Sequence, residues 1–153
     1  MGVFDGSGQV IRHLTIRGES YLGLFGRLAS SAEVKNLGVL DVNITGSGSY
    51  VAGLMGQNGG DVIHCYSTGV VSGSEYVGAL VGYNTGTMAH CYNTGSVSGE
   101  KHLVGGLAGD NRGTLTTCYN TGSVSGESMV GGLVGNNNGT LTQCYSTGAL
   151  SGG

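Results

Sequence analysis

The sequence predicts an all-β fold, a parallel β-solenoid of about six coils, and three observations lead to this prediction. Four cysteines, Cys65, Cys91, Cys118 and Cys144, recur at nearly constant spacing, and the residues around them repeat as a block. A fixed period of about 20 to 50 residues is typical of solenoids and related repeat folds. The chain also holds 33 glycines and no proline among 153 residues, which favours short strands joined by tight turns.

The repeat extends over most of the chain. The blocks around the cysteines read HCYSTGVVSG, HCYNTGSVSG, TCYNTGSVSG and QCYSTGALSG, and the segments before them read VAGLMGQN, VGALVGYN, VGGLAGDN and VGGLVGNN. We therefore interpret residues 1–153 as a single domain. It divides into a partial lead-in coil, a longer divergent coil and four repeats: 1–20, 21–49, 50–75, 76–102, 103–128 and 129–153.

Each repeat contains three short segments of strand character, roughly VGGLVG, GTLTTCY and GSVSG. We expect the chain to wind one coil per repeat, in a right-handed sense, so that each strand pairs in register with its equivalent about 4.8 Å away. Equivalent residues should then stack in columns. Two glycine columns are expected at corners where φ is positive or the backbone turns sharply: Gly56, Gly82, Gly109 and Gly135, and Gly69, Gly95, Gly122 and Gly148.

Two earlier segments extend the column that holds the cysteines. IRHLTIRG (11–18) and VKNLGVLDVNITG (34–46) resemble the cysteine blocks, and leucine stands where they have cysteine. Leu and free Cys are both among the most buried residue types. The sequence therefore predicts an interior core column of Leu14, Leu37, Cys65, Cys91, Cys118 and Cys144. Stacked cysteines would also lie within bridging distance, so disulfide pairing stays an alternative.

A recurring asparagine predicts a structural ladder. Asn58, Asn84, Asn111 and Asn137 occupy one turn position, where each side-chain amide can bond its neighbours above and below. A calcium site would need several converging carboxylates, and the adjacent column Gln57, Tyr83, Asp110 and Asn136 offers only one. We therefore expect no metal site and no cofactor.

Two further columns are candidates for surface roles. If Tyr66, Tyr92, Tyr119 and Tyr145 face outward, they form a binding strip that can stack on sugars or on a partner protein; if the chain kinks, they belong to the core. Successive strand residues point to opposite faces, so one of two adjoining apolar columns should face solvent unless the glycines bend the strand. This predicts an association stripe at Leu54, Leu80, Leu107 and Leu133.

The segments GLMGQN, GLAGDN and GLVGNN, each followed by a CYxTGxVSG-like block, resemble the GLUG motif. This short repeat is seen in bacterial filamentous-haemagglutinin-like adhesins and in immunoglobulin A peptidases. The resemblance implies a secreted or cell-surface setting and an accessory role beside other domains of a parent protein. It implies no chemistry of its own, and no HExxH zinc motif surrounds His13, His64, His90 or His102.

Composition and charge exclude several functions. The formal charge of −3, with no run of Lys or Arg, disfavours nucleic acid and anionic membrane surfaces as partners. No apolar stretch is long enough to insert in a membrane, and we expect any export signal to lie outside this sequence. The only acids that share a column are Glu75, Glu100 and Glu127, at a corner where solvation is the ordinary explanation, so no catalysis is expected.

The sequence therefore predicts a non-catalytic extracellular repeat segment that serves as a rigid spacer or an adhesive module. Two alternatives stay open: a structural filament formed by stacking of open solenoid ends, and a carbohydrate-binding module that uses the tyrosine strip. The expected partners are other domains of the parent protein, further copies of the chain bound laterally or end to end, and a host or matrix glycan or protein.

Overall fold

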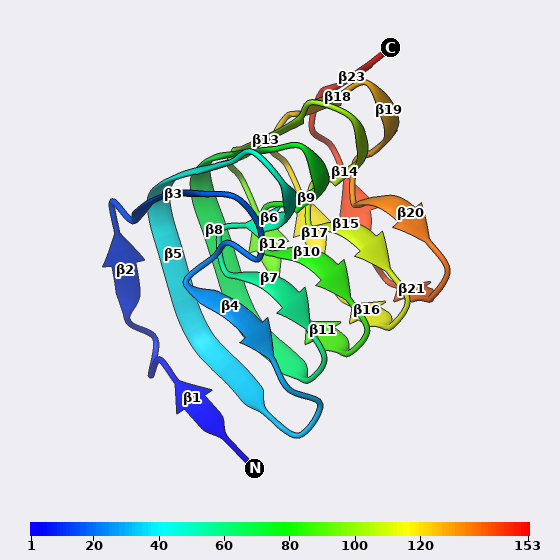
Figure 1. The fold of residues 1–153 in the computed structure, drawn as a ribbon. Helices are drawn as coiled ribbons and strands as arrows, with labels where there is room; N and C mark the ends of the chain where they lie inside the picture. The colour runs from blue at the N-terminus through cyan, green and yellow to red at the C-terminus, as the bar shows by residue number, and fades with distance from the viewer.

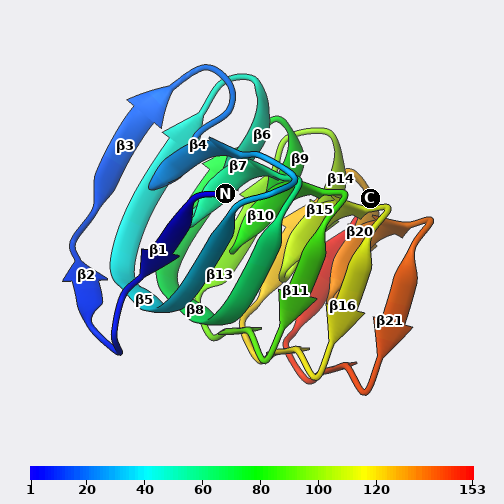
Figure 2. The same cartoon turned by 90° about the horizontal axis from the view of Figure 1, so that it is seen from below.

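A computed structural model describes residues 1–153 and confirms the predicted fold class (Figure 1). The chain contains 23 strands and no helix, and every strand pairing is parallel. Figure 2 shows the coils stacked in order from the N-terminal to the C-terminal end. The structure contains no helix of the length and apolar character that crossing a membrane requires.

The strands form three parallel sheets along the rod. The five-stranded sheet contains β4 (Phe25–Leu28), β7 (Met55–Asn58), β10 (Val81–Asn84), β15 (Ala108–Asn111) and β20 (Val134–Asn137). The four-stranded sheet contains β6 (Ser49–Ala52), β9 (Glu75–Gly78), β14 (His102–Gly105) and β19 (Ser128–Gly131).

The fourteen-stranded sheet is bent, and its longest strands are β5 and β8. It contains β1 (Val3–Asp5), β2 (Val10–Arg12), β3 (Thr15–Gly18), β5 (Glu33–Gly46) and β8 (Asp61–Gly73). In the later coils the equivalent segments are β11 (Thr87–Ala89), β12 (Tyr92–Asn93), β13 (Ser96–Gly99), β16 (Thr114–Thr116), β17 (Tyr119–Asn120), β18 (Val124–Gly126), β21 (Thr140–Thr142), β22 (Tyr145–Ser146) and β23 (Leu150–Gly152).

The predicted VGGLVG strand is two strands that belong to different sheets. In one coil β14 ends at Gly105 and β15 begins at Ala108, with a sharp corner between them. Each later coil therefore has five short segments rather than three. Alternation of faces applies along a straight strand and not across a corner, so both Leu107 and Ala108 point inward and are 0% exposed.

This corner corrects the predicted association stripe. Leu54, Leu80 and Leu107 are each 0% exposed, and Leu133 is half-buried against the same core. The adjoining Met55, Val81 and Ala108 are equally buried. The leucines are therefore core residues, and no apolar stripe faces solvent at this position.

The register of the first coil corrects the predicted core column. Phe4 pairs with Val34, and Thr15 pairs with Asn43, which places Leu14 beside Val42 rather than beside Leu37. Residues 11–18 resemble the cysteine blocks in sequence, but they do not pair in the register that this resemblance predicts. Leu14 is therefore not part of the column that contains Leu37 and the cysteines. Leu37 itself pairs with Cys65 as expected.

The left-handed corners are formed mainly by residues other than glycine. Positive φ occurs at two glycines, Gly8 and Gly69, so among the eight column glycines only Gly69 has a positive φ. The recurring corners carry Asn36, His64, His90, Thr117 and Gln143 in one column, and Tyr21, Tyr50, Tyr76, Leu103 and Met129 in another. A glycine such as Gly82 is needed for close approach instead, since a Cβ there would lie 2.7 Å from the carbonyl oxygens of Gly56 and Tyr76.

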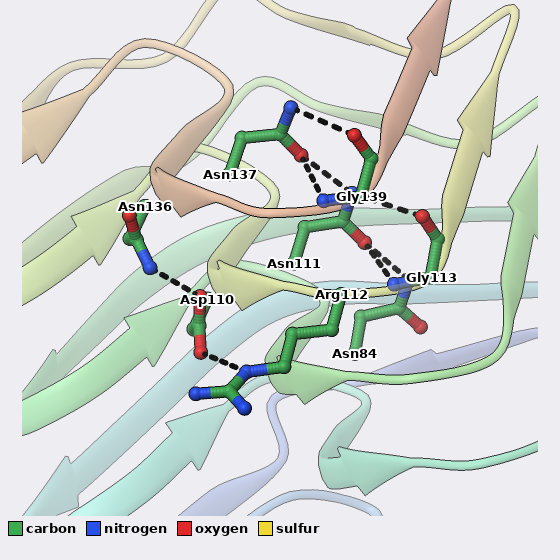
Figure 3. Close-up of polar contacts among 8 residues, drawn as sticks. All are labelled: Asn84, Asp110, Asn111, Arg112, Gly113, Asn136, Asn137 and Gly139. Carbon is green, nitrogen blue, oxygen red and sulfur yellow. Dashed lines mark hydrogen bonds and ion pairs between the residues drawn. The ribbon is translucent and has the colours of Figure 1, made fainter.

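The asparagine column forms a continuous hydrogen-bonded ladder (Figure 3). The Nδ2 of Asn58 donates to Oδ1 of Asn84, Asn84 donates to Asn111, and Asn111 donates to Asn137, each over 2.8 Å. The Oδ1 of Asn111 also accepts the backbone N–H of Gly113. Each coil is therefore joined to the next by side chains as well as by the backbone.

A second, shorter ladder was not predicted. Asn93 donates to Oδ1 of Asn120 over 2.9 Å, and its own Oδ1 accepts the N–H of Gly95. The same position holds Ser67 and Ser146 in other coils, which hid the pattern in the sequence.

Replacing Asn111 by Ala should lower the free energy of unfolding by about 3 kcal/mol. The Nδ2 of Asn84 and the N–H of Gly113 lose their acceptor, and each buried polar group left without a partner costs about 1–3 kcal/mol. Urea unfolding followed by circular dichroism measures the change. Asn138→Ala is the matched control, because that exposed side chain lies next to the ladder outside it. Equal midpoints for the two variants would contradict the structural role of the ladder.

Candidate functional site

The cysteines lie in the interior as free thiols. Cys65, Cys91 and Cys118 are 0% exposed, Cys144 is half-buried, and none forms a disulfide. The Cys91 thiol donates to the carbonyl oxygen of Ala89 over 3.2 Å, across the left-handed corner at His90. Burial raises the pKa of the Cys65 thiol to about 11 and raises the pKa of Cys91 as well. Cys65 and Cys91 are therefore protonated structural groups, whereas the hydrogen bond from Cys91 lowers the pKa of the Cys118 thiol to about 7. All three side chains are 0% exposed, so none is an accessible nucleophile.

The corner before each cysteine turns the following tyrosine to the outside. Tyr66, Tyr92 and Tyr119 are half-exposed, and Tyr145 is 54% exposed. Their rings stack with centroid separations of 4.9, 4.9 and 5.1 Å and interplanar angles of 2° to 4°. Carbon atoms in contact lie about 3.5–4.0 Å apart, so these separations require laterally offset rings. The four tyrosine rings therefore form an offset parallel stack. We call these four residues the outer tyrosine ladder.

The first ring of the outer tyrosine ladder packs against a glycine of the preceding coil. Gly38 pairs with Tyr66 in register, and a Cβ at Gly38 would overlap the Tyr66 ring. The ring therefore lies over the backbone of the preceding coil. This contact sets the tilt of the first ring, and the following rings repeat it.

A groove runs along the last three rings of the outer tyrosine ladder. Its second wall is the left-handed column, in which the His64 and His90 rings stack at 4.7 Å and Thr117 donates to Gln143 over 3.3 Å. The groove has a volume of about 370 Å³ and is lined by His90, Tyr92, Thr117, Tyr119, Gln143 and Tyr145. It thus combines an aromatic wall with a polar wall.

The remaining tyrosines form a second ladder that sequence reasoning missed. Tyr21, Tyr50 and Tyr76 stack at 4.8 and 4.7 Å from a left-handed corner, and the ring of Tyr83 meets Tyr50 and Tyr76 edge-on. Burial, followed by the neighbouring tyrosines, raises the pKa of Tyr50. The recurring sequence segments YLG, YVAG and YVG could have indicated this second tyrosine column. All eight tyrosines of the sequence therefore belong to two stacked clusters.

The acidic residues do not converge on a common site. Asp110 is 1% exposed and accepts from Nδ2 of Asn136 over 2.9 Å and from Nε of Arg112 over 3.4 Å (Figure 3). The Arg112 guanidinium also lies over the Tyr83 ring at 5.7 Å. Glu75 is paired with Lys101 and His102 at the corner. No group of three or more His, Cys, Asp or Glu side chains is placed to hold a metal ion.

Comparison with known proteins identifies the repeat. Residues 73–98 and 126–151 match the model of the GLUG motif. The chain contains GLUG repeats. Each match begins at the end of one strand of the large sheet and runs once around the solenoid to the equivalent strand of the next coil. No curated protein matches the chain.

One solved structure shares the fold of these GLUG repeats. It is the crystal structure of a candidate immunoglobulin A1 protease from Bacteroides ovatus, with a TM-score of 0.74 and 19% sequence identity. The alignment covers 97% of this chain and 61% of that chain. At this identity the likeness establishes the solenoid architecture.

Replacing Gly38 by Ala should destabilise the protein by about 1–3 kcal/mol, the usual cost of overpacking. The added methyl group displaces the Tyr66 ring, so we also expect a weaker tyrosine signal in near-ultraviolet circular dichroism. Thermal unfolding measures the stability. Gly2→Ala is the control, because a Cβ at Gly2 has nothing within 4 Å. An unchanged melting temperature for Gly38→Ala would refute the contact.

The buried thiols should make stability fall at high pH. The pKa of Cys65 is about 11 in the folded chain against 9.0 for an ordinary thiol, so the unfolded chain loses this proton first. The stabilisation is present below pH 9 and is lost as the pH rises through about 11, with a magnitude of the order of 2 kcal/mol.

Urea unfolding between pH 8 and pH 11 should therefore give a flatter pH dependence for Cys65→Ala than for the unsubstituted chain. Leu37→Ala opens a cavity in the same column and removes no titrating group, so it should keep the original slope. Equal slopes for all three proteins would show that Cys65 does not contribute.

Proposed function

We propose that this chain is a rigid, non-catalytic module of an extracellular protein and that the groove along the outer tyrosine ladder is its adhesive surface. The observation that carries the proposal is the continuous row of four offset rings beside a polar wall. Aromatic rings bind the apolar faces of sugars, and the Thr117 hydroxyl, the Gln143 amide and the His90 ring can bond sugar hydroxyls.

The geometry favours an extended ligand that lies along the rod. Each coil presents one tyrosine and one polar residue, and the outer tyrosine ladder has a ring every 4.9 to 5.1 Å. Because the rings overlap, a ligand contacts the outer part of each ring rather than a whole face. A chain of sugar units can follow this stepped surface through several weak contacts, which add up without a deep pocket.

The extracellular setting rests on the GLUG repeats and on the candidate immunoglobulin A1 protease that shares the fold. This chain spans 61% of that protein, and we propose a comparable role as a supporting segment beside other domains. The proposed lack of catalysis is supported by the acids: Asp110 is buried under Arg112 and Asn136, and Glu75 is held by Lys101 and His102.

Lateral self-association through the leucine column is no part of this proposal, because those leucines are buried. End-to-end stacking of copies stays a prediction from the sequence.

Binding of the purified chain to a glycan array and to immobilised matrix proteins tests the adhesive surface. We expect Tyr119→Ala and Tyr145→Ala to weaken binding about three- to tenfold each, because an aromatic contact contributes about 0.5–1.5 kcal/mol. Tyr119→Phe keeps the ring and should bind nearly as well as the unsubstituted chain.

Tyr21→Ala is the matched control, because Tyr21 is 48% exposed, close to the 54% of Tyr145, and lies in the other ladder. Circular dichroism establishes that each variant is folded. If the alanine variants at Tyr119 and Tyr145 bind as tightly as the Tyr21 control, the outer tyrosine ladder is not the adhesive surface.

A further inference from the structure

The repeat is broken at one turn of the longer divergent coil, residues 21–49. In the later coils two residues separate the ladder asparagine from the next strand, as Gly59 and Gly60 do between Asn58 and Asp61. In the divergent coil four residues, 29–32, connect β4 to β5, and Leu28 stands in register with Asn58 (Figure 1). This widened turn is therefore a departure from a regular rod. In repeat proteins such insertions often line the binding face.

A groove of about 590 Å³ lies at the widened turn. Its polar lining comes from Arg27, Ser30, Gln57 and Thr85, and no acidic residue lines it. The Arg27 side chain is exposed and has no carboxylate within 4.0 Å, whereas Arg112 is engaged by Asp110. The groove therefore offers one uncompensated positive charge among neutral donors and acceptors.

The backbone of the widened turn adds further donors. The N–H groups of Ser30 and Ser31 make no hydrogen bond within the protein. The turn is nevertheless held in place, because Ala32 donates to the carbonyl of Ala29 over 3.0 Å and Gly59 donates to the carbonyl of Leu28 over 2.9 Å. Free amides on a fixed turn beside a guanidinium form an environment that favours an anion.

Aromatic rings stand next to this groove in the same column. Arg27 pairs with Gln57, and Gln57 pairs with Tyr83, so the three side chains follow one another across three coils. The ring of Tyr83 meets Tyr50 edge-on at 6.0 Å. A ligand that lies along the column thus passes from a cation to an amide and then to an aromatic surface.

We propose that this groove binds the carboxylate of an acidic sugar. The Arg27 guanidinium and the free amide of Ser30 hold the carboxylate, while Gln57, Thr85 and the Ser30 hydroxyl bond sugar hydroxyls. Leu28 and Ala29 are the only apolar lining residues, so the groove has little to offer an apolar peptide side chain. The site lies on the five-stranded sheet and is separate from the outer tyrosine ladder, so it stands or falls independently of the proposed adhesive surface.

Isothermal titration and nuclear magnetic resonance with the full chain test the proposal. The probes are 3′-sialyllactose and digalacturonate, which carry a carboxylate, with lactose as the neutral counterpart and a short polyglutamate peptide as a non-sugar acid. We expect both acidic sugars to bind and to shift the amide resonances of Ser30 and Ser31. Lactose and the peptide should bind at least tenfold more weakly. Binding of the acidic sugars should weaken with added salt.

Arg27→Gln should weaken acidic-sugar binding about ten- to a hundredfold, because it removes the charge-assisted hydrogen bonds. Arg17→Gln is the control, since Arg17 is an exposed arginine on β3 in the large sheet. Deletion of Ser30 and Ser31 restores the two-residue turn of the other coils and should also abolish binding.

Three outcomes would overturn the proposal. In the first, the unsubstituted chain binds neither acidic sugar. In the second, it binds lactose or polyglutamate as tightly as it binds the acidic sugars. In the third, the Arg27→Gln variant binds the acidic sugars as tightly as the Arg17→Gln control does. Should the deletion variant fail to fold, the two arginine variants still decide the question.

Discussion

The whole molecule depends on one constraint: in the repeated coils, residues lie in register beside their equivalents in the next coil. The pairing of Val62 with Met88 and of Met88 with Leu115 illustrates it. Parallel pairing at a spacing of about 4.8 Å forces like side chains into columns, so a residue type that suits one coil must suit its neighbours. Apolar columns then build the core, and any polar residue placed inside must find its partners along the column.

The asparagine ladder shows how the chain meets this requirement. A buried primary amide has both donors and acceptors, so it can accept from the preceding coil and donate to the following one, as Asn84 and Asn111 do. Tyrosines use the same repetition on the surface, where each ring packs on the next. The thiols satisfy their weaker donor locally, against the carbonyl two residues earlier. No buried side-chain polar atom is left without a partner.

Function in such a rod follows either from the repetition or from its interruption. The outer tyrosine ladder belongs to the first kind, because its groove exists only through the stacking of identical residues. The groove at Arg27 belongs to the second kind, because a turn longer by two residues leaves amides and a guanidinium without partners. The two proposed sites lie on different sheets, so one rigid module could present two distinct surfaces to an extracellular partner.

The sequence by itself determined the fold class, the repeat and the asparagine column, because a strict period of apolar and amide residues has few other ways to bury its groups. It could not place Leu54 inside, since that depends on a corner between β6 and β7, and alternation predicts the opposite face for a straight strand. It also could not set the first coil in register, because β1 and β2 pair along β5 and leave Leu14 beside Val42. Corners and register are decided by the packing of whole coils against one another, and a local pattern of residues does not contain that information.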